Sequence, residues 1–333
     1  MSWAFALAAG LLFQALAAHA DVPALPQAPQ ESQVAQVGQV GQGRQAPQES
    51  QLAQVSFVPE APQLPAALQP AALQPKPPGT VMRPLWEIGI GVGALRLPDY
   101  RGSDESRTRW FPVPYGVYRG KWLRADREGA RAVLLDGQAV EVDLSVAATP
   151  PTRSRNNAAR AGMPDLKAAI EFGPNANLTL LRSEALKAKL DLRLPLRAAF
   201  SVERSPRAIG ATFAPNLNLD LTEVAGAWNA GLLTGPVFAD RRYNERLYGV
   251  DAAYATAQRS AYRASGGYAG WQTLASVSRR FDGVWFGAFL RHDSLRGAVF
   301  ADSPLVRRDS AVTFGFAVSW VLSTSSELVA TPD

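Results

Sequence analysis

The sequence predicts an all-β protein, a transmembrane antiparallel up-and-down β-barrel of about 12 strands that follows a disordered segment rich in Gln and Pro. Three observations predict it: an export signal, runs in which apolar and polar residues alternate, and connections of unequal length. In the clearest run, residues 186–196, Leu or Ala fills every even position and charged residues or Pro fill the odd ones. Half-buried strands of soluble sheets alternate in the same way, so this run alone fits either class.

Residues 1–20 are predicted to be a Sec signal peptide. Their apolar run, 3–18, is shorter than the roughly 20 residues that span a bilayer, and it ends in Ala18-His19-Ala20. No Lys or Arg precedes this run, so an uncleaved signal anchor is the alternative. No later stretch reaches the length of a spanning helix, which excludes a helical inner-membrane protein. The absence of Cys fits an exported chain without disulfides.

Residues 21–83 are predicted to be a disordered periplasmic tether. They hold 13 Gln and 11 Pro with one aromatic residue, which is too little apolar surface to offset the chain entropy lost on folding. Gln recurs at every third position from Gln27 to Gln54, and polyproline II has three residues per turn. The repeat therefore predicts either a polar stripe presented to a periplasmic partner or a simple spacer.

Residues 84–322 are predicted to form the barrel. In the first strand, 86–94, apolar residues at even positions alternate with Glu and Gly, so one face suits lipid. Further alternating runs lie at 140–146, 216–221 and 312–320, with weaker ones at 166–181, 225–240, 268–280 and 284–293.

The connections between these runs fall into two classes. Short turns are predicted at 135–138, 182–184, 221–224 and 281–283, and long loops at 97–111, 149–165, 241–267 and 297–309. Outer-membrane barrels alternate short periplasmic turns with longer external loops. This asymmetry, together with the export signal, favours a barrel in the cell outer membrane over a soluble sandwich.

The number of strands is predicted from the directions in which the first and last strands cross the membrane. Both chain ends lie on the periplasmic side, so the number is even; splitting 112–135 into strands at 113–118, 121–125 and 130–135 gives 12, and merging it gives 10. Trp86 and Trp320 are expected in the interfacial girdle. Pro195 and Pro215 are expected at bulges or strand ends, because each lacks a ladder donor. Residues 323–333 are predicted to be a short C-terminal tail.

Catalytic signatures are weak in this sequence. After residue 20 the one histidine is His292, and its neighbours Asp293 and Ser294 alternate across a strand, so the three cannot form a Ser-His-acid set. Neither a metal-ligand spacing nor a phosphate-binding Gly-Lys loop is present. We therefore predict a protein that is not an enzyme and needs no cofactor or metal.

The net charge of +5 predicts anionic partners. For an exported barrel these are outer-membrane lipid and lipopolysaccharide, not nucleic acid. Solvated loop charges are the alternative explanation. The arginines predicted to contact lipopolysaccharide are Arg101, Arg107, Arg109, Arg241 and Arg242.

Several loop motifs resemble one known family. Residues 98–104 (PDYRGSD) followed by 111–115 (FPVPY), and then 162–166, 248–250 and 302–306, resemble, in order, motifs of the MltA-interacting protein (MipA)/OmpV family. The resemblance covers about residues 86–322. It implies an outer-membrane barrel that acts as a scaffold between a lytic transglycosylase and a peptidoglycan synthase, with other members linked to adhesion or solute passage.

The resemblance also assigns the first external loop. Its motif residues are Pro98, Tyr100, Gly102, Ser103 and Asp104; Pro98, Gly102 and the following Pro112 are expected to shape the loop, and Tyr100 and Asp104 to be available for contacts.

Two functions follow as expectations. The first is a non-enzymatic scaffold or anchor for periplasmic peptidoglycan-remodelling enzymes, and the second is a small pore or adhesin-type barrel that passes or binds small solutes. The residues expected to face the lumen of such a pore are Lys187, Lys189, Asp191 and Arg193.

Overall fold

The computed structural model describes residues 80–120, 123–126, 129–137 and 139–332. The predicted signal peptide, the Gln repeat and nearly all of the tether lie outside the described residues, as does the start of the short strand predicted at 121–125.

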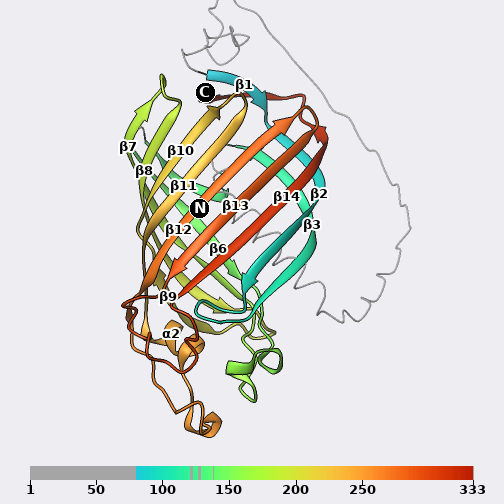
Figure 1. Cartoon of the computed structure of the whole chain (residues 1–333). Coiled ribbons are helices and arrows are strands. Elements are labelled where there is room, and N and C mark those ends of the chain that lie inside the picture. Colours follow the sequence, from blue (N-terminus) through green and yellow to red (C-terminus); the bar gives the residue numbers. More distant parts are fainter. Residues whose placement is uncertain (1–79, 121–122, 127–128, 138, 333) are drawn as a thin grey trace, which may run out of the picture. The chain divides into compact units, whose positions relative to one another are not determined.

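The described chain is an antiparallel barrel (Figure 1). Its strands are β2 (Trp86–Pro98), β3 (Ser106–Arg119), β4 (Leu123–Asp126), β5 (Gly129–Asp136), β6 (Val140–Thr149), β7 (Ala169–Ser183), β8 (Ala188–Ser201), β9 (Ala208–Phe213), β10 (Asn216–Val224), β11 (Trp228–Ala239), β12 (Gly267–Phe281), β13 (Val284–Ser294) and β14 (Ser310–Thr324). Sequential strands are neighbours, and β14 pairs with β2. The predicted up-and-down topology is confirmed.

The ring closes through β9 and β10, which behave as one interrupted strand. Both pair with β8 on one side and with β11 on the other. Counted in this way the barrel has 12 strands, and the prediction that split residues 112–135 into three is confirmed.

The interruption has a cause in the sequence. Pro215 lies in the break between β9 and β10, as predicted. Pro195 lies inside β8 instead of at a strand end, opposite Asn175 of β7, and its carbonyl accepts a bond from Ala214 N–H at 3.2 Å. Because Pro195 has no N–H to donate to the carbonyl of Ala214, the ladder is interrupted there, and the neighbouring strand is divided into β9 and β10.

The two ends of the barrel differ. We call the end with short connections the turn end and the end with long connections the loop end. At the turn end β1 (Thr80–Pro84) pairs with β15 (Leu328–Pro332) in a separate two-stranded sheet. β14 ends at Thr324, two residues beyond the barrel boundary predicted at residue 322. The segment predicted as a C-terminal tail, 323–333, contains the strand β15.

Side chains alternate across the wall as the period of two predicts. On β2 the outward residues Ile88, Ile90 and Val92 are 52%, 54% and 41% exposed, whereas Glu87 is buried. Outward apolar residues continue around the ring as a belt that includes Leu196, Leu217, Leu232, Val277, Leu290, Phe314 and Trp320. The loop end carries the one described α-helix, α2 (Arg241–Tyr248). Within the described ranges, helices are all too short or too polar to cross a bilayer.

Candidate functional site: the barrel interior and the loop cap

A polar wall lines one side of the barrel interior. At its centre Asp191 of β8 is fully buried and accepts a bond from Thr179 Oγ1 of β7 at 3.0 Å. Lys189 Nζ lies 2.9 Å from Asp191 Oδ2. Arg193 Nη2 lies 3.7 Å from the same oxygen and 3.4 Å from Asp220 Oδ2 of β10. The wall is thus a ladder of alternating charges on β8 and β10, to which Thr179 of β7 adds a neutral donor.

The polar wall continues onto β6. Asp143 accepts bonds from Asn177 Nδ2 at 2.7 Å and Asn175 Nδ2 at 3.2 Å. Nearby, Arg197 Nε donates to Ser145 Oγ at 2.6 Å. These inward polar side chains bond to one another, but Asn175 Oδ1 and Arg193 Nε are buried there without a hydrogen-bond partner among the described residues.

Three of the four predicted lumen residues, Lys189, Asp191 and Arg193, lie on this wall. Lys187 does not: it lies in the turn before β8 with a φ of 48°, and its ammonium pairs with Glu223 at the turn end. The alternating run begins at residue 186, two residues before β8, so the pattern could not separate the turn from the strand.

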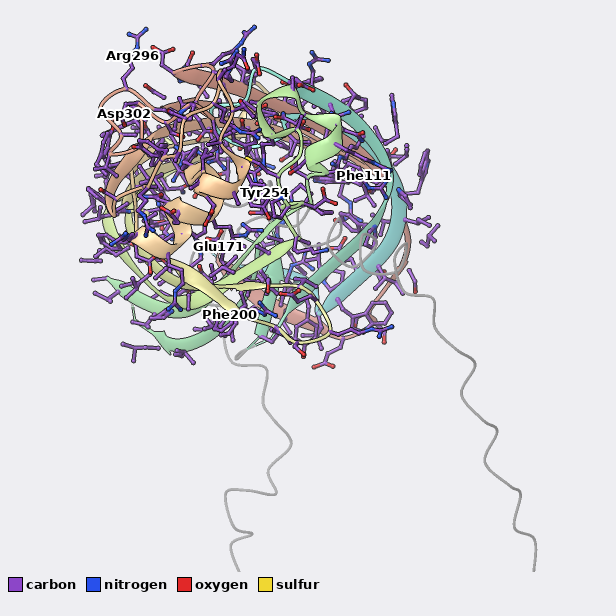
Figure 2. The ribbon with its side chains drawn as sticks, turned by 90° about the horizontal axis from the view of Figure 1, so that it is seen from below. Phe111, Glu171, Phe200, Tyr254, Arg296 and Asp302 are labelled. Carbon is purple, nitrogen blue, oxygen red and sulfur yellow. The ribbon has the colours of Figure 1, made fainter. Side chains whose placement is uncertain are left out.

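An apolar wall faces the interior on the opposite side of the ring. It is a cluster of Phe111, Val113, Leu233, Leu274, Trp285, Phe289 and Ala317, with Leu95 and Tyr115 packed against it. Figure 2, viewed from the loop end, shows Phe111 beside β3 and Glu171 under α2. The interior therefore has two sides, a buried polar wall and a buried apolar wall.

The long loops fold onto one another at the loop end, and we call this assembly the loop cap. Tyr248 and Phe300 are each 1% exposed, and their rings stack with centroids 3.6 Å apart. The core that they share with the strand ends consists of Tyr100, Leu166, Ala214, Val237, Ala239, Leu247, Tyr248, Val250, Ala264, Ala269, Leu295, Ala298, Phe300 and Leu305. Residues from four separate loops thus bury one hydrophobic core.

Buried polar contacts tie the loop cap together. Arg160 is 3% exposed and donates from Nη1 to Leu247 O at 3.1 Å. Ser303 Oγ donates to Tyr248 O at 2.7 Å. These bonds join loops that are far apart in sequence, so the cap has a defined structure.

The loop cap is also anchored to the polar wall. Tyr243 of α2 donates from its hydroxyl to Glu171 Oε1 of β7 at 2.8 Å, and Thr212 Oγ1 donates to Glu171 Oε2 at 3.0 Å. Burial raises the pKa of Tyr243 well above its usual value. Glu171 and Tyr243 were not predicted as site residues, because nothing in the sequence signals a contact between residues 72 positions apart.

The predicted motif of the first loop lies inside this cap. Tyr100 is 6% exposed, and its hydroxyl donates to Leu305 O at 2.8 Å. Gly102 has a φ of 94°, and a Cβ there would lie 2.8 Å from Leu295 Cδ1. Burial raises the pKa of Tyr100 to about 12. Tyr100 therefore makes its contacts within the protein, and Gly102 shapes the loop. Pro112 does not lie in the loop but within β3, opposite Val92 of β2.

The remaining motif residues divide between burial and exposure. Pro98 ends β2, and Ser103 is 2% exposed and accepts a bond from Asn157 Nδ2 at 3.0 Å. Asp104 is exposed to solvent. Of the motif, Asp104 alone presents its side chain at the surface.

Two of the predicted lipopolysaccharide contacts are ion-paired within the protein. Arg101 Nε lies 3.0 Å from Asp293 Oδ1, and Arg107 Nε lies 2.8 Å from Asp99 Oδ1. Both carboxylates are nearly inaccessible, with side chains 3% and 2% exposed. These two guanidinium groups hold the first loop in place.

Of the other three predicted contacts, Arg109 is half-buried and the two arginines of α2 are exposed. Arg109 Nη2 donates to Pro151 O at 3.3 Å, which connects β3 to the second loop. Arg241 and Arg242 are exposed at the start of α2. The two residues of α2 are therefore the best placed of the five to meet an external polyanion.

A buried ion cluster closes the barrel at the turn end. Glu87 of β2 has a side chain that is 2% exposed and lies 2.6 Å from Arg119 Nη2 of β3. It also pairs with Arg280 of β12. Arg119 Nη1 donates to Pro84 O at 2.6 Å, so the cluster fixes the point where β1 leaves the barrel.

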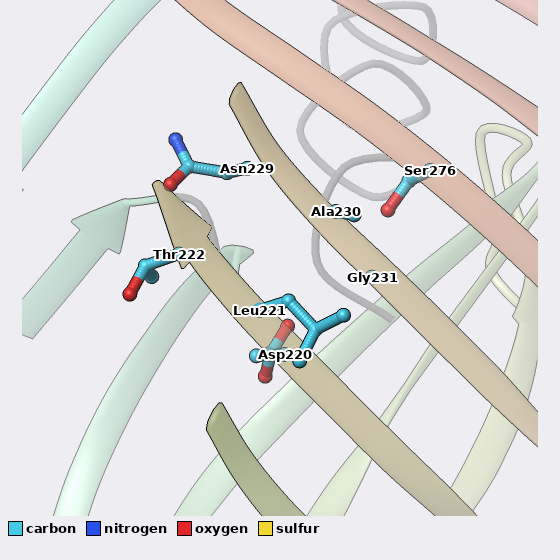
Figure 3. Close-up of a pocket in the computed structure, with 7 residues that line it drawn as sticks. All are labelled: Asp220, Leu221, Thr222, Asn229, Ala230, Gly231 and Ser276. Atoms are coloured by element: carbon cyan, nitrogen blue, oxygen red, sulfur yellow. The ribbon is translucent and has the colours of Figure 1, made fainter. Parts of the chain in front are cut away.

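A small pocket opens near the same end, with about 240 Å³ of free space that includes open solvent (Figure 3). It is lined by Asp220, Leu221, Thr222, Asn229, Ala230, Gly231 and Ser276. A Cβ at Gly231 would lie 2.8 Å from Ser276 Oγ, so the glycine leaves this space open. Among the described residues, no group of three or more His, Asp or Glu side chains could hold a metal ion.

Comparison with known proteins identifies the family. Two solved structures that resemble the chain are described as a bacterial polysaccharide outer membrane secretin, with 7% identity over 71% of this chain and 99% of that one and a TM-score of 0.37, and the NanC porin, with 10% identity over 70% and 100% and a TM-score of 0.34. No curated protein matches the chain. The model of the family described as MltA-interacting protein MipA matches residues 90–322, the whole of the barrel from within β2 to within β14. The chain therefore belongs to the MipA family, as its loop motifs predicted.

Proposed function

We propose that this protein is a non-enzymatic barrel of the cell outer membrane that anchors peptidoglycan-remodelling enzymes at its turn end, which faces the periplasm. The family name supports a lytic transglycosylase as one partner, and a peptidoglycan synthase is the second partner that the resemblance implies. The belt of outward apolar residues supports the membrane location.

The observation that carries the proposal is the contrast between the two ends. The loop end is occupied by a packed core, whereas β1 and β15 extend the chain beyond the barrel at the turn end. Met82 of β1 and Leu328 of β15 are 49% and 52% exposed there. Apolar side chains at that position are available to a periplasmic protein.

The test is binding of a purified lytic transglycosylase to the barrel in lipid nanodiscs. Met82→Glu combined with Leu328→Glu is expected to weaken binding about tenfold or more, because two apolar contacts are lost. Tyr254→Glu, in the loop cap, is the matched control and is expected to leave binding unchanged. Equal binding by all three proteins would contradict docking at β1 and β15, and absence of binding by the unaltered protein would contradict the scaffold itself.

A small pore is the second candidate, supported by the charged ladder at Asp191. Planar-bilayer recording separates the two. Steady, ion-selective current from the unaltered protein favours a pore, whereas a silent barrel that binds the transglycosylase favours the scaffold. Asp191→Asn is expected to change the ion selectivity of any such current, because it removes the central charge of the wall.

A further inference from the structure

A basic side chain lies among aromatic rings on the outer surface of the barrel, near the turn end. The guanidinium carbon of Arg279 on β12 is 4.5 Å from the centre of the Phe281 ring and 5.7 Å from that of Trp228. Trp228 packs edge to face against Phe281 and Phe286, with centroids 6.3 and 6.0 Å away. We call these four residues the arginine cage.

The arginine cage faces away from the barrel interior. In register, Trp228 of β11 and Phe286 of β13 lie on either side of Arg279. Ser278, the residue before Arg279, faces the interior and is 2% exposed, whereas Phe281 is 46% exposed. Because side chains alternate across a strand, Arg279 points outward, on the same side as Phe281.

Two outward aromatic residues of β12 mark the boundaries of the apolar belt. Phe281 and Trp271 are ten positions apart, which is about 33 Å along the strand and about 25 Å across the bilayer for a tilt of about 40°. The apolar band of outer-membrane barrels has about this height. Arg279 therefore lies just inside the turn-end boundary, and its guanidinium reaches over Phe281 toward the headgroups.

Arg279 has no counter-ion in the part of the chain that the structure describes. Its Nε is buried without a hydrogen-bond partner, and its guanidinium forms neither a hydrogen bond nor an ion pair with another described residue. The neighbouring Arg280, in contrast, is paired with Glu87. A cation without a counter-charge is costly at the edge of a bilayer. Aromatic faces hold the guanidinium but do not neutralise it, so its Nη groups are available to an external anion.

Apolar side chains continue the outward surface from the arginine cage toward the bilayer centre. In register across β11, β12 and β13 they form two rows: Ala230, Val277 and Ala288 in the first, and Leu232, Ala275 and Leu290 in the second. Leu232 and Leu290 are 44% and 52% exposed, and Ala275 between them has a single methyl group, so the second row is a shallow groove. Arg279 and Ala275 are about 13 Å apart along the strand, so a headgroup at the cage and a chain in this groove occupy separate residues.

We propose that the arginine cage binds the phosphate of an anionic phospholipid in the leaflet at the turn end. The Nη groups of Arg279 donate to the phosphate oxygens, and the aromatic rings hold the guanidinium in place. One acyl chain lies over Ala275, between its two leucine neighbours. An anionic lipid neutralises the cation, whereas a zwitterionic lipid adds a cation of its own, so the anionic class is favoured. This site is independent of the docking proposed for β1 and β15.

The test is native mass spectrometry of the whole protein, in which the lipids bound to one barrel are counted. Purified protein in detergent is titrated with phosphatidylglycerol, which is anionic, or with phosphatidylcholine of the same acyl chains, which is zwitterionic. The first phosphatidylglycerol is expected to bind with an about tenfold lower dissociation constant than the first phosphatidylcholine. Equal dissociation constants for the two lipids would overturn the proposal.

Two arginine variants locate the headgroup. Arg279→Gln removes the cation of the cage and is expected to bring the dissociation constants of the two lipids within about twofold of each other. Arg182→Gln, at an exposed arginine near the turn end of β7, is the matched control and is expected to keep the preference. If Arg279→Gln also keeps the preference, the headgroup binds elsewhere and the proposal is wrong.

Two further variants locate the acyl chain and keep the test decisive if Arg279→Gln does not fold. Ala275→Phe fills the groove, leaves the arginine cage intact and is expected to weaken phosphatidylglycerol binding at least about fivefold. Val312→Phe, at an outward residue of β14, is the control and should leave this binding unchanged. Unchanged binding by Ala275→Phe, or an equal loss in both variants, would overturn the proposal.

Discussion

Replacing Phe300 with Ala is expected to open the loop cap without unfolding the barrel. The ring is 1% exposed and stacks on Tyr248 at a centroid distance of 3.6 Å. Truncation of a buried Phe to Ala costs about 3–5 kcal/mol. Since each 1.4 kcal/mol is a factor of ten, the open form of the cap should become roughly a hundredfold to a few thousandfold more populated.

Hydrogen exchange measures this opening directly. The amide of Val250 donates to Tyr262 O at 2.8 Å and is buried in the cap, so it reports cap opening. Phe314→Ala, on the lipid-facing side of β14, is the control and should leave the exchange of Val250 unchanged. If Phe300→Ala accelerates the hydrogen exchange of barrel amides as much as that of the Val250 amide, the cap and the barrel unfold together. If it leaves Val250 unchanged, the core assigned to the cap does not hold it closed.

Three further predictions concern the membrane face, the cap and the polar wall. Leu190→Arg should lower the free energy of unfolding, measured with urea in lipid, by about 2–4 kcal/mol if the residue lies near the bilayer midplane. Leu186→Arg, in the turn, should lower it much less. Equal decreases would mean that the lipid-facing side of β8 is misassigned. Burial raises the pKa of Tyr100 to about 12, against about 10 in an unfolded chain, so the cap should be fully stable below pH 10 and lose stability as pH rises to 12. Tyr100→Phe should reduce this loss, measured by exchange of Val250, and an unchanged pH profile would exclude Tyr100 as its source. Asp191→Ala should cost about 3–5 kcal/mol in the unfolding assay, because it leaves Arg193 buried with one counter-charge fewer; a cost below about 1 kcal/mol would show that water solvates the wall.

The strands could be predicted because their signal is local. The period of two in 86–94 and 312–320 follows from the contrast between lipid and interior, and the structure has β2 and β14 at these residues. Pro215 marked the break between β9 and β10 for an equally local reason, its missing N–H. At Pro195 the same rule failed, because the strand continued and its neighbour was interrupted instead.

The loop cap could not be predicted because its contacts are distant in sequence. The bond from Tyr100 to Leu305 joins residues 205 positions apart, and Arg160 and Leu247 are 87 apart. From the sequence, Arg101 and Arg107 were typical surface charges. Their partners Asp293 and Asp99 are brought close to them by the folding of the first loop against β13 and β3, which no period or motif encodes.

The packed loop end constrains how a solute reaches the barrel interior from outside. Passage through the loop end requires separation of a core in which Tyr248, Phe300 and Leu305 are at most 1% exposed, and the cost of exposing such side chains is several kcal/mol. This cost is compatible with a scaffold whose partners act at the turn end, and it argues against a general pore, for which the loop end would need to stay open.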